Sequence, residues 1–136
     1  MQVPNTPAVW PAGFYTVTVM VQRPGETYRR STNQLSFPLA PRITVSPLSA
    51  AGPSITYAVT TAPEVWPEQF VALLLGDDEI VAPPRTSQIG TVTFNAQDLL
   101  PGDYFVRLRV DGVDSILIDR SVTPPVFDQT QKVKVT

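Results

Sequence analysis

Carboxylates are the side chains of this sequence that could carry acid–base or metal chemistry. The chain has no Cys and no His, which excludes thiolate nucleophiles, thiolate or imidazole metal ligands and a Ser-His-Asp relay. The densest acidic run is Asp77-Asp78-Glu79, and a second pair, Asp111 and Asp114, flanks Gly112. Either group could contribute to a calcium site, which needs about six to eight oxygen ligands, or could form the acid pair of a hydrolase.

Both acidic groups are better explained as turns. Asp-Gly favours a tight hairpin, and Asp77 follows Gly76 at the end of an apolar run. The calcium-loop spacing Asp-x-Asp-x-Asp-Gly is absent, as are a phosphate-binding glycine loop and a nucleophile elbow. Neither acid pair has a neighbour that would separate the two pKa values. We therefore predict a protein that is not an enzyme, with no catalytic, cofactor-binding or metal-ligating residues and no cofactor.

The composition limits which secondary-structure elements and which classes of partner this protein can have. The chain has 136 residues, 43% of them hydrophobic, and 15 prolines. This is enough apolar material for a core, but the prolines leave little room for long helices. The net charge of −2 argues against nucleic acid as a partner. No apolar run reaches the roughly 18–20 residues of a membrane span, and the start lacks a secretory signal pattern. We predict neither membrane insertion nor a small-molecule substrate.

Alternating apolar residues predict short strands. The clearest is 104–110, where Tyr104, Val106, Leu108 and Val110 share one face. Asp111-Gly112 should turn this strand into a returning one over 115–118. Further strands are predicted at 54–60, 70–75, 79–81, 91–94 and 131–136, with 70–75 as a central strand, and a single helical turn is predicted over 95–100. Several short strands separated by Pro/Gly turns indicate an all-β antiparallel sandwich.

An internal repeat refines this prediction. Residues 11–21 echo residues 100–110, so that Gly13 and Tyr15 align with Gly102 and Tyr104 at an offset of 89 residues. That offset approximates one immunoglobulin-like module. We predict a complete immunoglobulin-like β-sandwich over 43–136. Residues 1–42 would be the C-terminal hairpin of a truncated or partial module, joined by the turn at 23–26. The chain would be cut from a longer protein, or its first hairpin would dock on the second module.

The aligned tyrosines have a structural interpretation. Immunoglobulin-like sandwiches carry a Tyr near the start of strand F whose hydroxyl bonds upstream backbone. Tyr15 and Tyr104 stand where such residues would. Val17 and Val106, two residues further on, occupy the place where antibody domains carry Cys. Missing disulfides suit a module that folds in a reducing cytoplasm.

Two groups of side chains are candidates for surface contacts. Arg23, Arg29 and Arg30, with Arg42 further on, make the N-terminal hairpin basic, which suits either docking of an acidic partner or a solvated loop. Trp10 and Trp66 are each followed by Pro. Together with Tyr57 they would form a platform for a sugar or a partner, or else plug the edge of the core, as aromatic rings often do in small sandwiches.

Three longer phrases carry a family resemblance, and they cover residues 33–43, 71–77 and 104–115. The chain resembles the C-terminal region of the cap, or tail-terminator, proteins of extracellular contractile injection systems. These are phage-tail-like particles in which a sheath drives a tube through a target membrane. The stretch Arg109-Val110-Asp111-Gly112-Val113-Asp114-Ser115 is the most specific part. The N-terminal domain that forms the capping ring in that family is not among the residues of this chain.

The resemblance implies a structural role. It suggests an accessory immunoglobulin-like sandwich on a ring at the distal end of the particle, with protein partners inside a larger assembly, including copies of itself. Assembly would take place in a bacterial cytoplasm, and the protein would then be part of a released or anchored particle. The alternative function is a carbohydrate- or cell-surface-binding β-sandwich module. A hydrolase using Asp77 with Glu79, or Asp111 with Asp114, ranks last.

Overall fold

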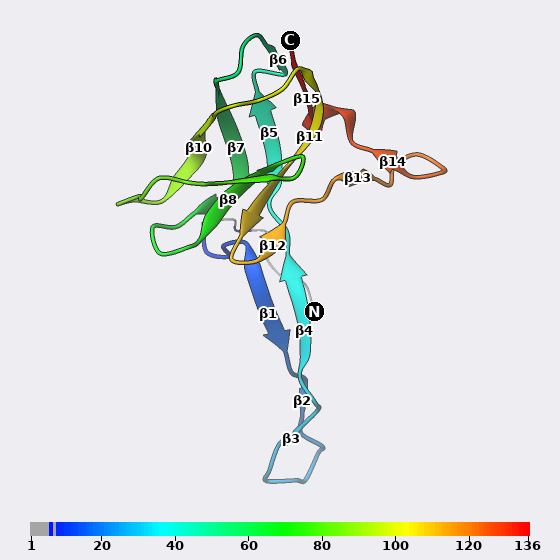
Figure 1. Ribbon diagram of the computed structural model, residues 1–136. Coiled ribbons are helices and arrows are strands. Elements are labelled where there is room, and N and C mark those ends of the chain that lie inside the picture. Colours follow the sequence, from blue (N-terminus) through cyan, green and yellow to red (C-terminus); the bar gives the residue numbers. More distant parts are fainter. Residues whose placement is uncertain (1–5, 7) are drawn as a thin grey trace.

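The computed structural model describes Thr6 and residues 8–136, and in this part of the chain the regular structure is β-strand apart from one short 3-10 helix, Gln129–Gln131 (Figure 1). The strands are β1 Gly13–Val17, β2 Met20–Val21, β3 Arg30–Ser31, β4 Leu35–Leu39, β5 Arg42–Ser46, β6 Ser49–Ala50, β7 Ile55–Val65, β8 Val71–Leu75, β9 Asp78–Val81, β10 Ile89–Ala96, β11 Gly102–Val110, β12 Val113–Asp114, β13 Ile118–Asp119, β14 Val126–Phe127 and β15 Lys132–Val135. No helix in the described residues has the length and apolar character needed to cross a lipid bilayer.

Two sheets enclose the core. One has the strand order β10-β7-β5, and the other has the order β6-β15-β11-β8-β9, with β12 paired to β11. Neighbouring strands are antiparallel except β6, which runs parallel to β15. Alternating apolar side chains of β7, β10, β11 and β15 belong to one buried cluster, together with Leu73 and Leu75 of β8. The arrangement is consistent with a β-sandwich.

Most of the predicted strands are confirmed, and β7 and β10 are longer than expected. Ile55, Tyr57 and Val59 of β7 are buried on one side. Of the run 70–75, residues 71–75 form β8, which is buried along its whole length and lies between β11 and β9, as expected of a central strand, whereas Phe70 is exposed. Asp111 and Gly112 both have positive φ, +47° and +82°. This is the backbone of a tight hairpin turn of type I′, which Asp-Gly favours.

Two predicted elements are wrong. Residues 95–100 do not form a helical turn, because Asn95 and Ala96 end strand β10. Asp98 then takes a positive φ of +56°, and the buried Leu99 donates its N–H to the Pro53 carbonyl. The returning strand predicted over 115–118 is also wrong. The strand that returns along β11 is β12, Val113–Asp114, and after one further backbone hydrogen bond from the Ser115 N–H to the Leu108 carbonyl the chain leaves the sheet.

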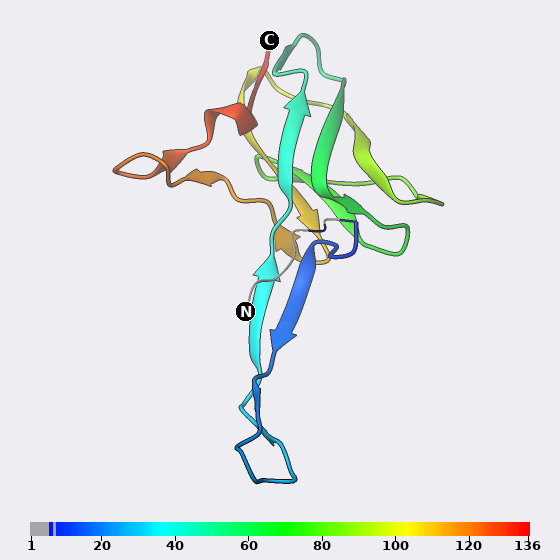
Figure 2. The same ribbon diagram turned by 180° about the vertical axis from the view of Figure 1, so that it is seen from behind.

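Two extensions project from the core-bearing sheets (Figures 1 and 2). In the first, β1 pairs with β4 and β2 pairs with β3, giving a long hairpin over residues 13–39. The second, here called the arm, comprises residues 116–128, where β13 pairs with β14. Strand β4 runs into β5 through only Ala40-Pro41. Residues 1–5 and 7 lie outside the described part.

Candidate functional site

The aligned tyrosines make the same contact in both halves of the chain. The Tyr104 hydroxyl donates to the Leu100 carbonyl at 2.8 Å, and the Tyr15 hydroxyl donates to the Pro11 carbonyl at 2.6 Å. Each acceptor lies four residues before its tyrosine. Burial raises the pKa of the Tyr15 phenol, so the group donates as a neutral hydroxyl at ordinary pH. The repeat read from the sequence is thus also a repeat of local structure.

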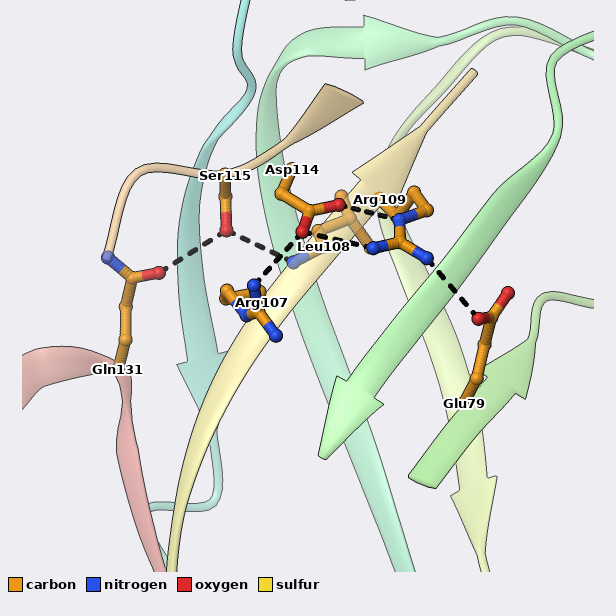
Figure 3. A network of polar contacts seen from close by, with 7 residues as sticks. All are labelled: Glu79, Arg107, Leu108, Arg109, Asp114, Ser115 and Gln131. Atoms are coloured by element: carbon orange, nitrogen blue, oxygen red, sulfur yellow. Dashed lines mark hydrogen bonds and ion pairs between the residues drawn. The ribbon is translucent and has the colours of Figure 1, made fainter. Parts of the chain in front are cut away.

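Asp114 belongs to an ion-pair network on the outer face of the sheet (Figure 3). Its carboxylate lies 3.1 Å from Arg107 and 2.6 Å from Arg109, and Arg109 also reaches Glu79 at 3.4 Å. The hydrogen bond and charge of Asp114, with a smaller contribution from Glu79, raise the pKa of Arg109. The Arg109–Glu79 pair joins β11 to β9 across β8. Asp114 and Glu79 therefore act as counter-ions of arginines.

Asp111 occupies a different place, at the junction between the N-terminal hairpin and the sheets. Its carboxylate accepts the N–H of Phe70 and the side-chain amide of Gln69, both at 2.9 Å. Gln69 is buried, and its amide nitrogen also donates to the Ala12 carbonyl at 2.8 Å. The structure separates the functions of Asp111 and Asp114, since each has its own set of donors. Asp111 fastens the hairpin to the β11–β12 turn.

The acidic run 77–79 spans the end of the β8–β9 turn and the start of β9. The chain reverses at Gly76 and Asp77, and Asp78 already pairs with Leu75. Asp77, Asp78 and Glu79 are exposed. Within Thr6 and residues 8–136, no group of three or more acidic side chains is placed to hold a metal ion.

The four arginines of the N-terminal region do not form one patch. Arg23, Arg29 and Arg30 are exposed at the far end of the hairpin. Arg30 pairs with Glu26 at 3.1 Å and lies 5.2 Å from the centre of the Tyr28 ring. Arg42 instead belongs to β5 and lines a hollow beside the arm.

The three aromatic candidates also lie in different environments. Tyr57 is buried in the core, so it offers no surface to a ligand. Trp66 is half-buried, and its indole Nε1 is shielded from solvent without a hydrogen-bond partner. Trp10, just before the hairpin, is exposed, and its ring centre lies 5.3 Å from that of Tyr15, which in turn lies 5.7 Å from that of Phe37. Only Trp10 belongs to an accessible aromatic group.

The arm is the candidate site that the sequence interpretation missed. It exposes large apolar side chains at Ile116, Ile118, Val122, Val126 and Phe127. Beside it lies an open hollow of about 760 Å³, bounded by residues 40–44, by the first part of the arm and by Asp128, Thr130 and Gln131. A signal was present in the sequence. The interval between Asp114 and Lys132 is far longer than a hairpin loop requires.

Both ends of the arm are fixed to the sheet. At the first end, the Leu108 N–H donates to the Ser115 hydroxyl at 3.0 Å, and Ser115 lies 3.4 Å from Gln131 (Figure 3). Gln131 is buried, and its amide donates to the Ile116 carbonyl at 2.8 Å and to Asp128 at 3.0 Å. The hydrogen bond from Gln131, with further ones from Thr130, lowers the pKa of Asp128. The arm thus projects from an ordered base.

These observations define an all-β protein with antiparallel sheets around one core and with two projecting two-stranded extensions. Residues 40–136 match the model of a family described as a domain of unknown function, DUF8756, and the chain belongs to that family. No curated protein and no solved structure matches the chain significantly.

Proposed function

We propose that this chain is a non-enzymatic, immunoglobulin-like module that acts through protein–protein contacts of the arm. We place it in the cap, or terminator, protein of a contractile injection particle. The observation that carries the proposal is the arm itself, an ordered extension that exposes apolar side chains to solvent. Large apolar patches exposed on a folded domain mark sites of contact with proteins, membranes or ligands.

The strand order supports the immunoglobulin-like assignment. In that fold, strands A, B and E belong to one sheet and strands C, F and G to the other. Here β5, β7 and β10 share one sheet, whereas β8, β11 and β15 share the second. Tyr104, near the start of β11, bonds the Leu100 carbonyl, as the strand-F tyrosine does in such domains.

The arm is suited to binding because it is already ordered in the free protein, so that little conformational entropy is lost when it meets a partner. Ser115 and Gln131 hold its two ends, and the Phe127 ring packs 5.0 Å from that of Phe105. The fewer side chains and loops become immobilised on binding, the larger is the share of the contact energy that appears as binding free energy. Ile118 and Phe127 are 43% and 53% exposed, so covering what remains of each would contribute about half of a full burial, or about 0.7–1.5 kcal/mol each.

The particle setting is supported by the resemblance of residues 33–43, 71–77 and 104–115 to contractile-injection cap proteins. In that setting the partners are other subunits of the particle, including copies of this protein in a ring. Assembly takes place in the bacterial cytoplasm before the particle is released or anchored.

The test is incorporation into particles. Ile118→Ser and Phe127→Ser, made together in the full-length protein in its own bacterium, should remove it from purified particles, as measured by sedimentation and immunoblotting. Val81→Ser is the matched control because Val81 is an exposed apolar residue on β9, away from the arm. Full incorporation of the arm variant would contradict the arm's role. Particles of normal length without the gene, or a protein that never co-sediments with tail-like particles, would contradict the setting.

Trp10 favours a second candidate, a carbohydrate- or cell-surface-binding module. Its ring is exposed next to Tyr15, and such rings can stack on sugars. Binding on a glycan array that Trp10→Ala abolishes and Trp66→Ala leaves intact would establish this function. An array without binding would remove it.

A further inference from the structure

We infer that the β1–β4 hairpin is the last strand pair of a second sandwich. We also infer that the facing sheet of that sandwich, supplied by the same polypeptide before residue 1, covers the hairpin's apolar face. We call this face, formed by Trp10, Tyr15, Val17, Leu35 and Phe37, the hairpin face. The inference does not depend on what the arm binds.

The first step is that the two strand pairs share one register. In β1 and β4, Gly13 lies opposite Leu39 and Tyr15 opposite Phe37. In β11 and β15, Gly102 lies opposite Val135 and Tyr104 opposite Val133. Both tyrosines also bond the carbonyl four residues before them. Directly opposed residues point to the same side of a sheet. The face of β11 and β15 that points into the core therefore identifies the corresponding face of β1 and β4.

The second step compares burial at corresponding positions. In β11 and β15, Val106 and Val133 are 0% and 1% exposed. Their counterparts Val17 and Phe37 are both 38% exposed, and Leu35 is 71% exposed. Trp10 corresponds to Leu99, which is buried, whereas Trp10 itself is exposed. The hairpin face therefore has the sequence of a core surface, but the part of the chain that the structure describes contains no layer that covers it.

The third step identifies the occupant. In the complete sandwich, the chain reaches Tyr104 directly from β10, which belongs to the opposite sheet. That sheet covers the inner face of β11 and β15 with side chains such as Tyr57, Val59 and Phe94. By the same topology, the facing sheet of the first sandwich would precede the hairpin in the polypeptide. The hairpin cannot supply such a sheet, and an isolated two-stranded ribbon is marginally stable in water.

The fourth step concerns how the two sandwiches would join. Only Ala40-Pro41 separates β4 from β5, and both views show the two strands following one another in one direction (Figures 1 and 2). Gln69 bonds the Ala12 carbonyl, and Asp111 bonds Gln69, so the base of the hairpin is fastened to the β11–β12 turn. The inferred protein is thus a tandem of sandwiches with a short, bonded junction.

The experiment compares this 136-residue chain with the protein extended by its natural upstream sequence. Hydrogen–deuterium exchange of the amides in 13–17 and 35–39 should slow at least about tenfold in the extended protein, because these strands become part of a closed core. Leu35→Ser should abolish that protection in the extended protein and leave exchange in the 136-residue chain unchanged. Phe14→Ser is the control because Phe14 is equally apolar and 64% exposed, but lies on the opposite face of the same strand pair.

Four outcomes would overturn the inference. The first is a gene without in-frame sequence before residue 1. The second is equal exchange in the two proteins. The third is an effect of Phe14→Ser as large as that of Leu35→Ser. The fourth is a dimer of the 136-residue chain that Leu35→Ser dissociates, since the hairpin face would then be covered by a second copy.

Discussion

Replacing two neighbouring leucines of β8 by alanine should have clearly different effects on stability. Leu73 and Leu74 are 0% and 7% exposed, so the two residues look equivalent by burial alone. Leu73 belongs to the core cluster between the sheets, whereas Leu74 points to the outer face. On that face it lies opposite Arg107 on β11 and Glu79 on β9.

The magnitudes follow from what can fill the space. Leu→Ala removes about three carbon groups, each contributing about 0.8 kcal/mol when buried, or about 2.4 kcal/mol in total. At Leu73 the surrounding core cannot collapse, and the cavity raises the loss to about 3–5 kcal/mol. At Leu74 the long arginine stems on the same face can close over the gap, which holds the loss to about 1–2.5 kcal/mol.

The assay is urea unfolding followed by far-UV circular dichroism, with the free energy of unfolding extrapolated to water. The urea dependence of that free energy should be unchanged in both variants, so that the midpoints report stability alone. Val81→Ala on the exposed side of β9 is the control and should cost less than about 0.5 kcal/mol. A loss at Leu74 equal to or greater than that at Leu73 would refute the assignment of the two faces.

Three further outcomes are expected. Tyr104→Phe should cost about 0.5–1.5 kcal/mol in urea unfolding, because it removes one partly solvated hydrogen bond; an unchanged midpoint would show that the bond from Tyr104 to the Leu100 carbonyl does not stabilise the fold. Gln69→Ala should cost about 1–3 kcal/mol and speed amide exchange near Ala12, since a buried junction loses its donor; exchange there at the unmodified rate would contradict the fastening role. Hydrogen bonds, the largest from Gln131, lower the pKa of Asp128 in the folded protein. The resulting stabilisation is complete above the unfolded pKa of about 3.9 and is lost as pH falls through the folded value. Asp128→Asn should therefore flatten the decline of the urea midpoint between about pH 5 and pH 2, and an identical decline would show that the carboxylate contributes nothing.

Sequence patterns predicted the strands well where alternation and turn chemistry agreed. The strand 104–110 had both, and β11 with its Asp111-Gly112 turn confirms it. The prediction over 95–100 was wrong because local helix preference competed with tertiary contacts. Phe94 and Ala96 are buried as members of β10, and Leu99 bonds the distant Pro53 carbonyl. Neither contact is visible in a window of six residues.

In the candidate sites, too, local sequence patterns predicted some features and tertiary contacts decided the others. The aligned tyrosines were found because a repeat at fixed spacing is a property of the sequence. The different roles of Asp111 and Asp114 could not be found in this way. The donors to Asp111 are Gln69 and Phe70, which lie up to 42 residues away in the chain. The donor arginines of Asp114 lie within the same hairpin. The arm escaped prediction because its strands are only two residues long, too short for an alternating pattern.

The sequence by itself determined the all-β architecture, the places of most strands and the repeated tyrosine segment. Each of these depends on side-chain periodicity, proline and glycine, which act over a few neighbouring residues. The tertiary structure decided which repeated segment is buried. Val106 is enclosed because β7 and β10 lie across from it, whereas Val17 has the same local pattern and no facing sheet among Thr6 and residues 8–136. Burial requires a second layer, and the position of that layer is fixed only when distant strands pair.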